Sequence, residues 1–246
     1  MKSIERLVQS GLNRFGLELR RLRRPDAEYT EVHPRAMYSP WNTDPAFSAF
    51  YAQVERHTLV DVYRCYELWS LTRELASVPG ALIEVGVWRG GSGAVIAKSA
   101  SLAGIQDTIY LCDTFQGVPK AGRRDPVYRG GEHADTSRST VEALLAKMGL
   151  SNAKVVPGVF PEESASALSS ERFRLAHIDV DVYQSARDCV EYLWPRMSTG
   201  GVVVFDDYGF DGLRGIREYA DELRGRPGQL FVHNLNGHGL LVRVRP

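Results

Sequence analysis

Four short apolar segments, each ending in a glycine or an aspartate, constrain the fold of this chain more than any other feature. They are Ala81–Gly86, Thr108–Asp113, Phe173–Asp179 and Gly201–Asp206. Helical patterns separate them, and alternation of buried strands with helices is typical of a mostly parallel sheet. A further strand is predicted at Ala153–Pro157, and a closing hairpin at Gln229–Val244 would turn at Asn236 and Gly237. We therefore predict an α/β fold with about seven strands.

Helices are predicted between these strands from apolar residues that recur at helical spacing. The predicted helices are Ala46–Ser77, Ser92–Leu102, Thr140–Met148, Glu162–Leu168, Gln184–Met197 and Leu213–Arg224. Residues 114–137 are rich in glycine and are predicted to form a long loop.

The first 24 residues form a separate amphipathic and strongly basic pattern that Pro25 ends. Such a helix could touch an anionic membrane surface, a substrate or a partner. It could equally be an arm packed on the body or on a second subunit, which we favour because charged helical faces are usually solvated. We therefore expect a homo-oligomer, with residues 1–64 as a helical arm and connector and residues 65–246 as a single α/β domain.

Composition excludes several classes of protein. The chain has 30 basic and 30 acidic side chains, whereas nucleic-acid-binding proteins usually carry a basic excess. It has no apolar run of about 18 residues that could span a membrane, and no apolar core of a secretory signal. Its three cysteines, Cys65, Cys112 and Cys189, are scattered and show neither a metal-binding nor a disulfide pattern. We expect them to be core residues of a cytoplasmic protein.

Two strand ends together indicate a nucleoside with an anionic tail. The first predicted strand runs into a glycine-rich turn over Glu84–Ser92, where glycines let a ligand approach the backbone and a helix begins. The second ends at Asp113, and an acidic residue in this position suits the two hydroxyls of a ribose. The alternative is a ligand-free turn in which Asp113 is a helix cap or turn residue.

Two pairs of aspartates follow the next two long strands. Asp179 and Asp181 come after one, and Asp206 and Asp207 come after the other. Carboxylates brought together at one sheet edge would repel and raise one another's pKa values. A divalent cation removes this conflict, and an all-oxygen ligand set favours Mg²⁺ or Mn²⁺. The alternative is a pair of turns with capping aspartates.

The remaining polar candidates are less specific. His177 lies inside a predicted strand and is interpreted as a core residue, and His238 as part of a turn. His133 lies in the long loop and is a candidate to touch substrate. Tyr183 and Tyr208 follow the aspartates and could line the site or pack in the core.

With these motifs, the chain resembles the macrocin O-methyltransferase family of class I S-adenosylmethionine (SAM)-dependent methyltransferases. The resemblance covers about residues 80–240. It is carried by Glu84–Ser92, Leu111–Gly117, His177–Ser185 and the run Gly200–Gly209. Members methylate sugar hydroxyls of antibiotics or other glycosylated metabolites. The resemblance implies a Rossmann-like sheet of seven strands with an antiparallel last strand, and a small glycosylated molecule as the substrate.

The resemblance also implies roles for individual residues. Asp179, Asp206 and Asp207 would hold Mg²⁺, and Asp179 would also be the catalytic base. Trp88 and Ser92 would lie beside the methionine part of SAM, Asp113 at the ribose, and Gly158 to Phe160 near the adenine. The full predicted cofactor-binding set is Glu84, Gly86, Trp88, Gly90, Ser92, Asp113, Thr114, Phe115, Gly158 and Phe160. Asp181 could orient a ligand from behind.

Two other functions fit parts of the pattern. Asp179-Val180-Asp181 also matches the D-x-D of metal-dependent nucleotide-sugar glycosyltransferases, although the glycine-rich turn with Glu84 and the Asp206-Asp207 pair argue against this function. A non-catalytic subunit with the same fold would lack a catalytic carboxylate, and none is missing from this chain.

Overall fold

The computed structural model describes residues 11–12, 28–32 and 36–245. The chain divides into two units, residues 1–35 and 36–246, of which the second holds the sheet. The basic helix predicted over residues 1–24 lies outside the described residues, except for Gly11 and Leu12, which are helical. In the part of the chain that is described, no helix is both long and apolar enough to cross a membrane.

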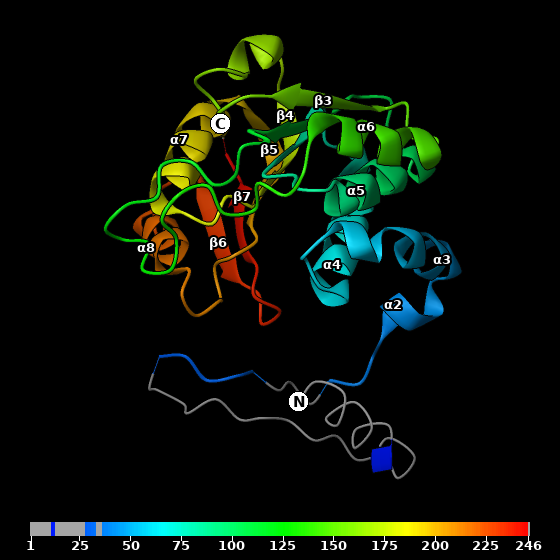
Figure 1. The fold of residues 1–246 in the computed structure, drawn as a ribbon, viewed down its shortest axis with the longest axis horizontal. Coiled ribbons are helices and arrows are strands. Elements are labelled where there is room, and N and C mark those ends of the chain that lie inside the picture. Colours follow the sequence, from blue (N-terminus) through cyan, green and yellow to red (C-terminus); the bar gives the residue numbers. More distant parts are fainter. Residues whose placement is uncertain (1–10, 13–27, 33–35, 246) are drawn as a thin grey trace. The chain divides into compact units, whose positions relative to one another are not determined.

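A seven-stranded sheet forms the centre of residues 36–246 (Figure 1). The strands are β1 Ala81–Val85, β2 Ile109–Asp113, β3 Ala153–Pro157, β4 Phe173–Ile178, β5 Met197–Phe205, β6 Gln229–His233 and β7 Gly239–Arg243. Their order is β3-β2-β1-β4-β5-β7-β6, and β7 pairs antiparallel with both β5 and β6. The predicted seven-stranded sheet with an antiparallel last strand is therefore confirmed.

Helices precede and connect the strands. They are α2 Pro40–Thr43, α3 Pro45–Val54, α4 Val62–Glu74, α5 Gly91–Leu102, α6 Arg138–Lys147, α7 Tyr183–Leu193 and α8 Arg214–Glu222. Short 3₁₀ turns cover Glu55–His57, Leu75–Ser77, Ala165–Leu168 and Trp194–Arg196.

Three predicted helices are wrong in detail. The predicted helix Ala46–Ser77 is two helices, because Asp61 begins α4 by accepting hydrogen bonds from the backbone N–H groups of Tyr63 and Arg64. The predicted helix Glu162–Leu168 is reduced to its 3₁₀ end. The helix predicted to reach Met197 ends at Leu193, just before Pro195, and Met197 already belongs to β5.

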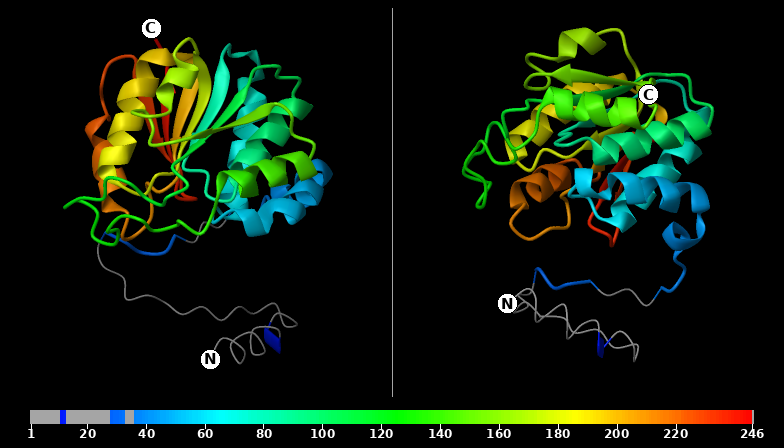
Figure 2. Two further views of the ribbon diagram at one scale, coloured as in Figure 1. Left: turned by 45° about the horizontal axis from the view of Figure 1, so that its top comes forward. Right: turned by 45° about the vertical axis from the view of Figure 1, so that its right-hand side comes forward.

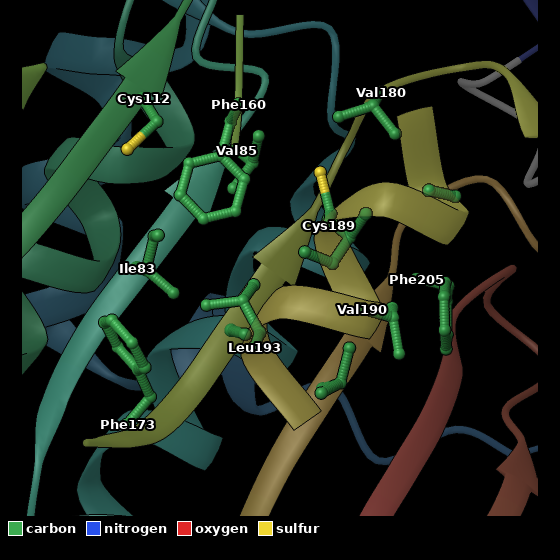
Figure 3. Close-up of a cluster of buried hydrophobic side chains, with 14 of the residues drawn as sticks. Ile83, Val85, Cys112, Phe160, Phe173, Val180, Cys189, Val190, Leu193 and Phe205 are labelled. Atoms are coloured by element: carbon green, nitrogen blue, oxygen red, sulfur yellow. The ribbon is translucent and has the colours of Figure 1, made fainter. Parts of the chain in front are cut away.

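Alternate residues of the strands face two separate apolar layers. Helices α7 and α8 cover one face of the sheet, whereas α3 to α6 cover the other (Figure 2). Figure 3 shows the first layer, in which Ile83 and Val85 of β1 belong to the same buried cluster as Leu193 of α7 and Phe173 of β4. All three cysteines are buried and free, as predicted.

Candidate active site at the carboxyl edge of the sheet

The turn after β1 lies directly against the end of β4. Gly86 has a φ of 89°, and a Cβ there would lie 1.6 Å from the carbonyl oxygen of Asp179. Gly90 also has a φ of 89° and precedes α5, whose first residues are buried, Ser92 among them. Glycine is needed at both positions because other residues rarely adopt this conformation. The turn thus runs from close contact with Asp179 at Gly86 to the start of α5 at Gly91.

Asp113 fastens this turn to the end of β2. Its Oδ2 atom accepts hydrogen bonds from the backbone N–H groups of Val87 and Trp88, at 2.7 and 2.9 Å. Its Oδ1 atom accepts one from Phe115, at 2.7 Å. The hydroxyl of Thr114 donates to the carbonyl of Gly117 at 2.8 Å. Asp113 therefore has the role of a turn residue in this structure, and its carboxylate is fixed at the carboxyl edge of β1 and β2.

Glu84 is fully buried on β1 and is only partly satisfied. Its Oε1 atom lies 2.9 Å from Nδ1 of His177. Its Oε2 atom is buried and has no hydrogen-bond partner among the described residues. An unpaired buried carboxylate oxygen is costly, and it fits a ligand that brings its own positive donor. The α-ammonium group of a methionine moiety is such a donor.

The three aspartates predicted to hold a metal converge. One carboxylate oxygen from each of Asp179, Asp206 and Asp207 lies within 4.8 Å of the other two. Burial and the neighbouring carboxylates raise the pKa values of Asp179 and Asp207 well above the usual range. Oδ2 of Asp207 is also buried without a hydrogen-bond partner among the described residues. Oxygen ligands, excess negative charge and an unsatisfied oxygen together fit a divalent cation.

Asp206 is the best-supported member of this trio. Its Oδ1 atom lies 3.3 Å from Nε2 of His177 and 3.0 Å from Nε2 of His238, and its Oδ2 atom accepts a hydrogen bond from Arg64. Burial alone would raise its pKa, but the hydrogen bonds of the two histidines and the charge of Arg64 outweigh burial and lower it. Asp206 is therefore ionised in this site, which a metal ligand requires.

Arg64, Glu67 and His238 were missed by reasoning from the sequence. His238 does close the turn between β6 and β7, as predicted, because its carbonyl accepts a hydrogen bond from the backbone N–H of Asn234 at 2.9 Å. Its ring, however, is fully buried between Asp206 and Glu67. The sequence contained one weak indication that Arg64 has a role in the site. Arg64 is buried and lies one helical turn before the apolar Leu68, so a charge interrupts the buried face of that helix.

The carboxylate of Asp181 contacts the long loop of residues 114–137. The hydroxyl of Tyr128 donates to its Oδ1 at 2.5 Å and lies 3.2 Å from Nε2 of His133. Burial raises the pKa of Asp181, which the hydrogen bond from Tyr128 partly opposes. His133 is exposed, so it is available at the surface of the loop. These contacts hold the loop against the end of β4.

Other predicted cofactor residues lie around the same edge. Nε1 of Trp88 donates to Asp135 of the long loop at 2.8 Å. The backbone N–H of Gly158 donates to the carbonyl of Asp113 at 2.9 Å, which keeps this turn beside β2. Phe160 is buried, with its ring edge-on to Tyr192.

Comparison with known proteins gives the geometry its context. The macrocin O-methyltransferase (TylF) family matches residues 48–228. The chain belongs to this family. One relative, from Streptomyces olivaceus, is 35% identical over 203 residues, which cover 76% of this chain and 75% of the relative. It is named 8-demethyl-8-(2,3-dimethoxy-alpha-L-rhamnosyl)-tetracenomycin-C 4'-O-methyltransferase. Mycinamicin III 3''-O-methyltransferase of Micromonospora griseorubida is 31% identical over 181 residues, covering 67% and 70%.

Solved structures agree on the fold. The O-methyltransferase NovP is 23% identical, with a TM-score of 0.66 over 77% of this chain and 83% of NovP. The calicheamicin methyltransferase CalS11 is 18% identical, with a TM-score of 0.65 over 81% and 93%. These structures show the class I methyltransferase fold that the sequence predicted. The family and the two relatives show that the chain is an O-methyltransferase of a SAM-dependent family, rather than a glycosyltransferase.

Proposed function

We propose that this chain transfers the methyl group of SAM to a hydroxyl of a sugar in a glycosylated metabolite, and that it requires Mg²⁺. The observation that carries the proposal is the convergence of Asp179, Asp206 and Asp207 beside the unsatisfied Glu84. The named substrates of the two relatives support the acceptor class, since one of them carries a rhamnosyl group. A small glycosylated molecule is thus the proposed partner.

The cofactor would lie across the carboxyl edge of β1 and β2. Glu84 would accept the α-ammonium group at its free Oε2 atom, and the start of α5 at Ser92 would face the carboxylate, because a helix N-terminus favours an anion. Gly86, Gly90 and Trp88 would border the methionine part. Asp113, Thr114 and Phe115 would border the ribose, and Gly158 and Phe160 the adenine.

Asp179 would accept the proton of the attacking hydroxyl. It is the only member of the trio that is half-buried, so it faces the open side of the site, whereas Asp206 and Asp207 are buried. A bound dication would supply Lewis acidity that lowers the pKa of an acceptor hydroxyl. The remaining contribution of the chain is to hold the hydroxyl oxygen in line with the methyl group, which favours the transfer by orientation.

Substitution of the base tests this assignment. Asp179→Asn should abolish methyl transfer from labelled SAM to a panel of glycosylated acceptors, while calorimetry should show that SAM still binds. EDTA should silence the unaltered enzyme and Mg²⁺ should restore it. Glu142→Gln is the matched control, because it neutralises an exposed carboxylate on α6 that pairs only with Arg138 among the described contacts. Wild-type turnover in Asp179→Asn would remove Asp179 from the catalytic role.

Three expectations stay predictions: assembly into a homo-oligomer, the domain boundary after residue 64 and a cytoplasmic location. Contact of residues 1–24 with a membrane surface stays the less favoured alternative to packing on the body or on a second subunit. Liposome binding before and after removal of residues 1–24 tests the membrane contact, and the same truncation tests assembly by light scattering.

A further inference from the structure

A buried chain of hydrogen bonds joins the proposed cofactor site to the proposed metal site. His177 forms its centre, with Nδ1 2.9 Å from Oε1 of Glu84 and Nε2 3.3 Å from Oδ1 of Asp206. The side chains of His177 and Glu84 have no exposed surface, and that of Asp206 is 3% exposed. One rigid ring therefore contacts a carboxylate of each site, out of reach of bulk water.

Sheet register explains why these side chains meet. Glu84 and His177 are paired on the adjacent parallel strands β1 and β4, so their side chains lie on the same face. His177 pairs in turn with Val204 of β5, and Asp206 lies two residues further along that strand direction. The chain of contacts is thus fixed by three neighbouring strands of the core rather than by a mobile loop.

His238 provides a natural comparison within the same cluster. Its Nε2 atom lies 3.0 Å from the same Oδ1 atom of Asp206, but its Nδ1 atom lies 2.9 Å from Oε2 of Glu67 on α4. Both histidines therefore hold Asp206 in the same way, and His177 alone of the two continues to Glu84.

We propose that His177 is a positioning residue that couples cofactor binding to cation binding, by holding Asp206 with one ring nitrogen and Glu84 with the other. The proposal rests on the proposed function, which places the cofactor's ammonium group at Glu84 and the cation at Asp206. A ligand on the free oxygen of Glu84 changes how strongly its other oxygen holds the ring. The hydrogen bond between the ring and Asp206 then changes in strength as well. This change is large because the ring and both carboxylates are buried away from water.

Thermodynamic linkage makes the effect measurable from either side. If occupying the cofactor site changes the affinity for the cation by some factor, the cation changes cofactor affinity by the same factor. Replacing His177 by glutamine breaks the link between Asp206 and Glu84. The amide nitrogen of glutamine can donate to one of the two carboxylates, but its amide oxygen cannot donate to the other. His238→Gln makes the same chemical change at the same Asp206 oxygen without touching Glu84.

The test measures Mn²⁺ affinity by electron paramagnetic resonance, with and without saturating S-adenosylhomocysteine, in the full-length wild type, His177→Gln and His238→Gln. In the wild type, S-adenosylhomocysteine should change the Mn²⁺ dissociation constant by about fivefold or more. This ratio should fall to within about twofold of one in His177→Gln. In His238→Gln, Mn²⁺ should bind more weakly in both conditions and the ratio should keep its wild-type value.

A wild-type ratio near one, a ratio that persists in His177→Gln, or an equal loss in His238→Gln would each overturn the coupling. These results differ from failure of the proposed function, in which the wild type would bind no Mn²⁺ or no S-adenosylhomocysteine, and the coupling would fall with it. Should His177→Gln fail to fold, ¹⁵N-histidine NMR of the wild type decides. S-adenosylhomocysteine alone should move the ring signals of His177 more than those of His238, and unmoved His177 signals would overturn the proposal.

Discussion

Replacement of Gly93 by alanine should damage the cofactor site more than the fold. Gly93 lies in the first turn of α5 and is fully enclosed. A Cβ at this position would lie 2.5 Å from Oε2 of Glu84 and 2.6 Å from Cδ2 of Leu111, where ordinary contacts are 3.4 Å or more. Leu111 is fully buried, and Glu84 is held at its other oxygen by His177. The new methyl group must therefore displace the oxygen that is proposed to receive the ammonium group.

The effect on stability is the difference of two opposing terms. Alanine favours a helix over glycine by about 1 kcal/mol. Overpacking of a filled core costs about 1–3 kcal/mol. The free energy of unfolding should therefore fall by about 0–2 kcal/mol, which urea denaturation followed by circular dichroism can measure.

The effect on binding should be larger. Loss of a hydrogen bond to a charged group costs about 1.5–3 kcal/mol, which corresponds to roughly a 10- to 150-fold weaker affinity for S-adenosylhomocysteine by calorimetry. Gly122→Ala is the matched control, because the nearest atom to its new Cβ lies 3.7 Å away and its φ is not positive. If Gly93→Ala binds S-adenosylhomocysteine within about twofold of the wild type, the placement of the ammonium group at Glu84 is wrong.

Two further predictions concern charge. Glu84→Gln should weaken S-adenosylhomocysteine binding by a similar factor, about tenfold or more, and unchanged affinity in calorimetry would contradict the proposed ammonium contact. Burial and neighbouring carboxylates raise the pKa values of Asp179 and Asp207, so ionisation of these groups destabilises the fold as the pH rises above about 4. Burial of His177 is outweighed by its hydrogen bonds with Asp206 and Glu84, which raise its pKa to about 9, so its stabilising contribution is complete below about pH 6.5 and is lost towards pH 9. The Tm of the metal-free protein should therefore fall as the pH rises from about 6.5 to 9. Mg²⁺ should raise the Tm most at the alkaline end of this range. A Tm of the metal-free protein that rises with pH would contradict this prediction.

The sequence determined the succession of strands and helices along the chain and the edge of the sheet at which the chemistry lies. Apolar segments of five or six residues can be recognised as strands from local pattern alone, and β3 was predicted with its observed bounds. Parallel strands bring their carboxyl ends to one edge, so Asp179, Asp206 and Asp207 could be placed together without coordinates. These properties follow from local periodicity and the rules of sheet topology.

Only the tertiary structure decided which charges face one another across that edge. Arg64 contacts Asp206 although 142 residues separate them, and His238 reaches it from the turn directly before the antiparallel strand β7. The same geometry assigned Asp113 to the backbone of the glycine-rich turn and gave His177 a carboxylate on each side. Such pairings depend on how α4 packs on the sheet and on the register of β7 against β5. Sequence spacing does not encode either quantity, because both are set by the volume and fit of the whole core.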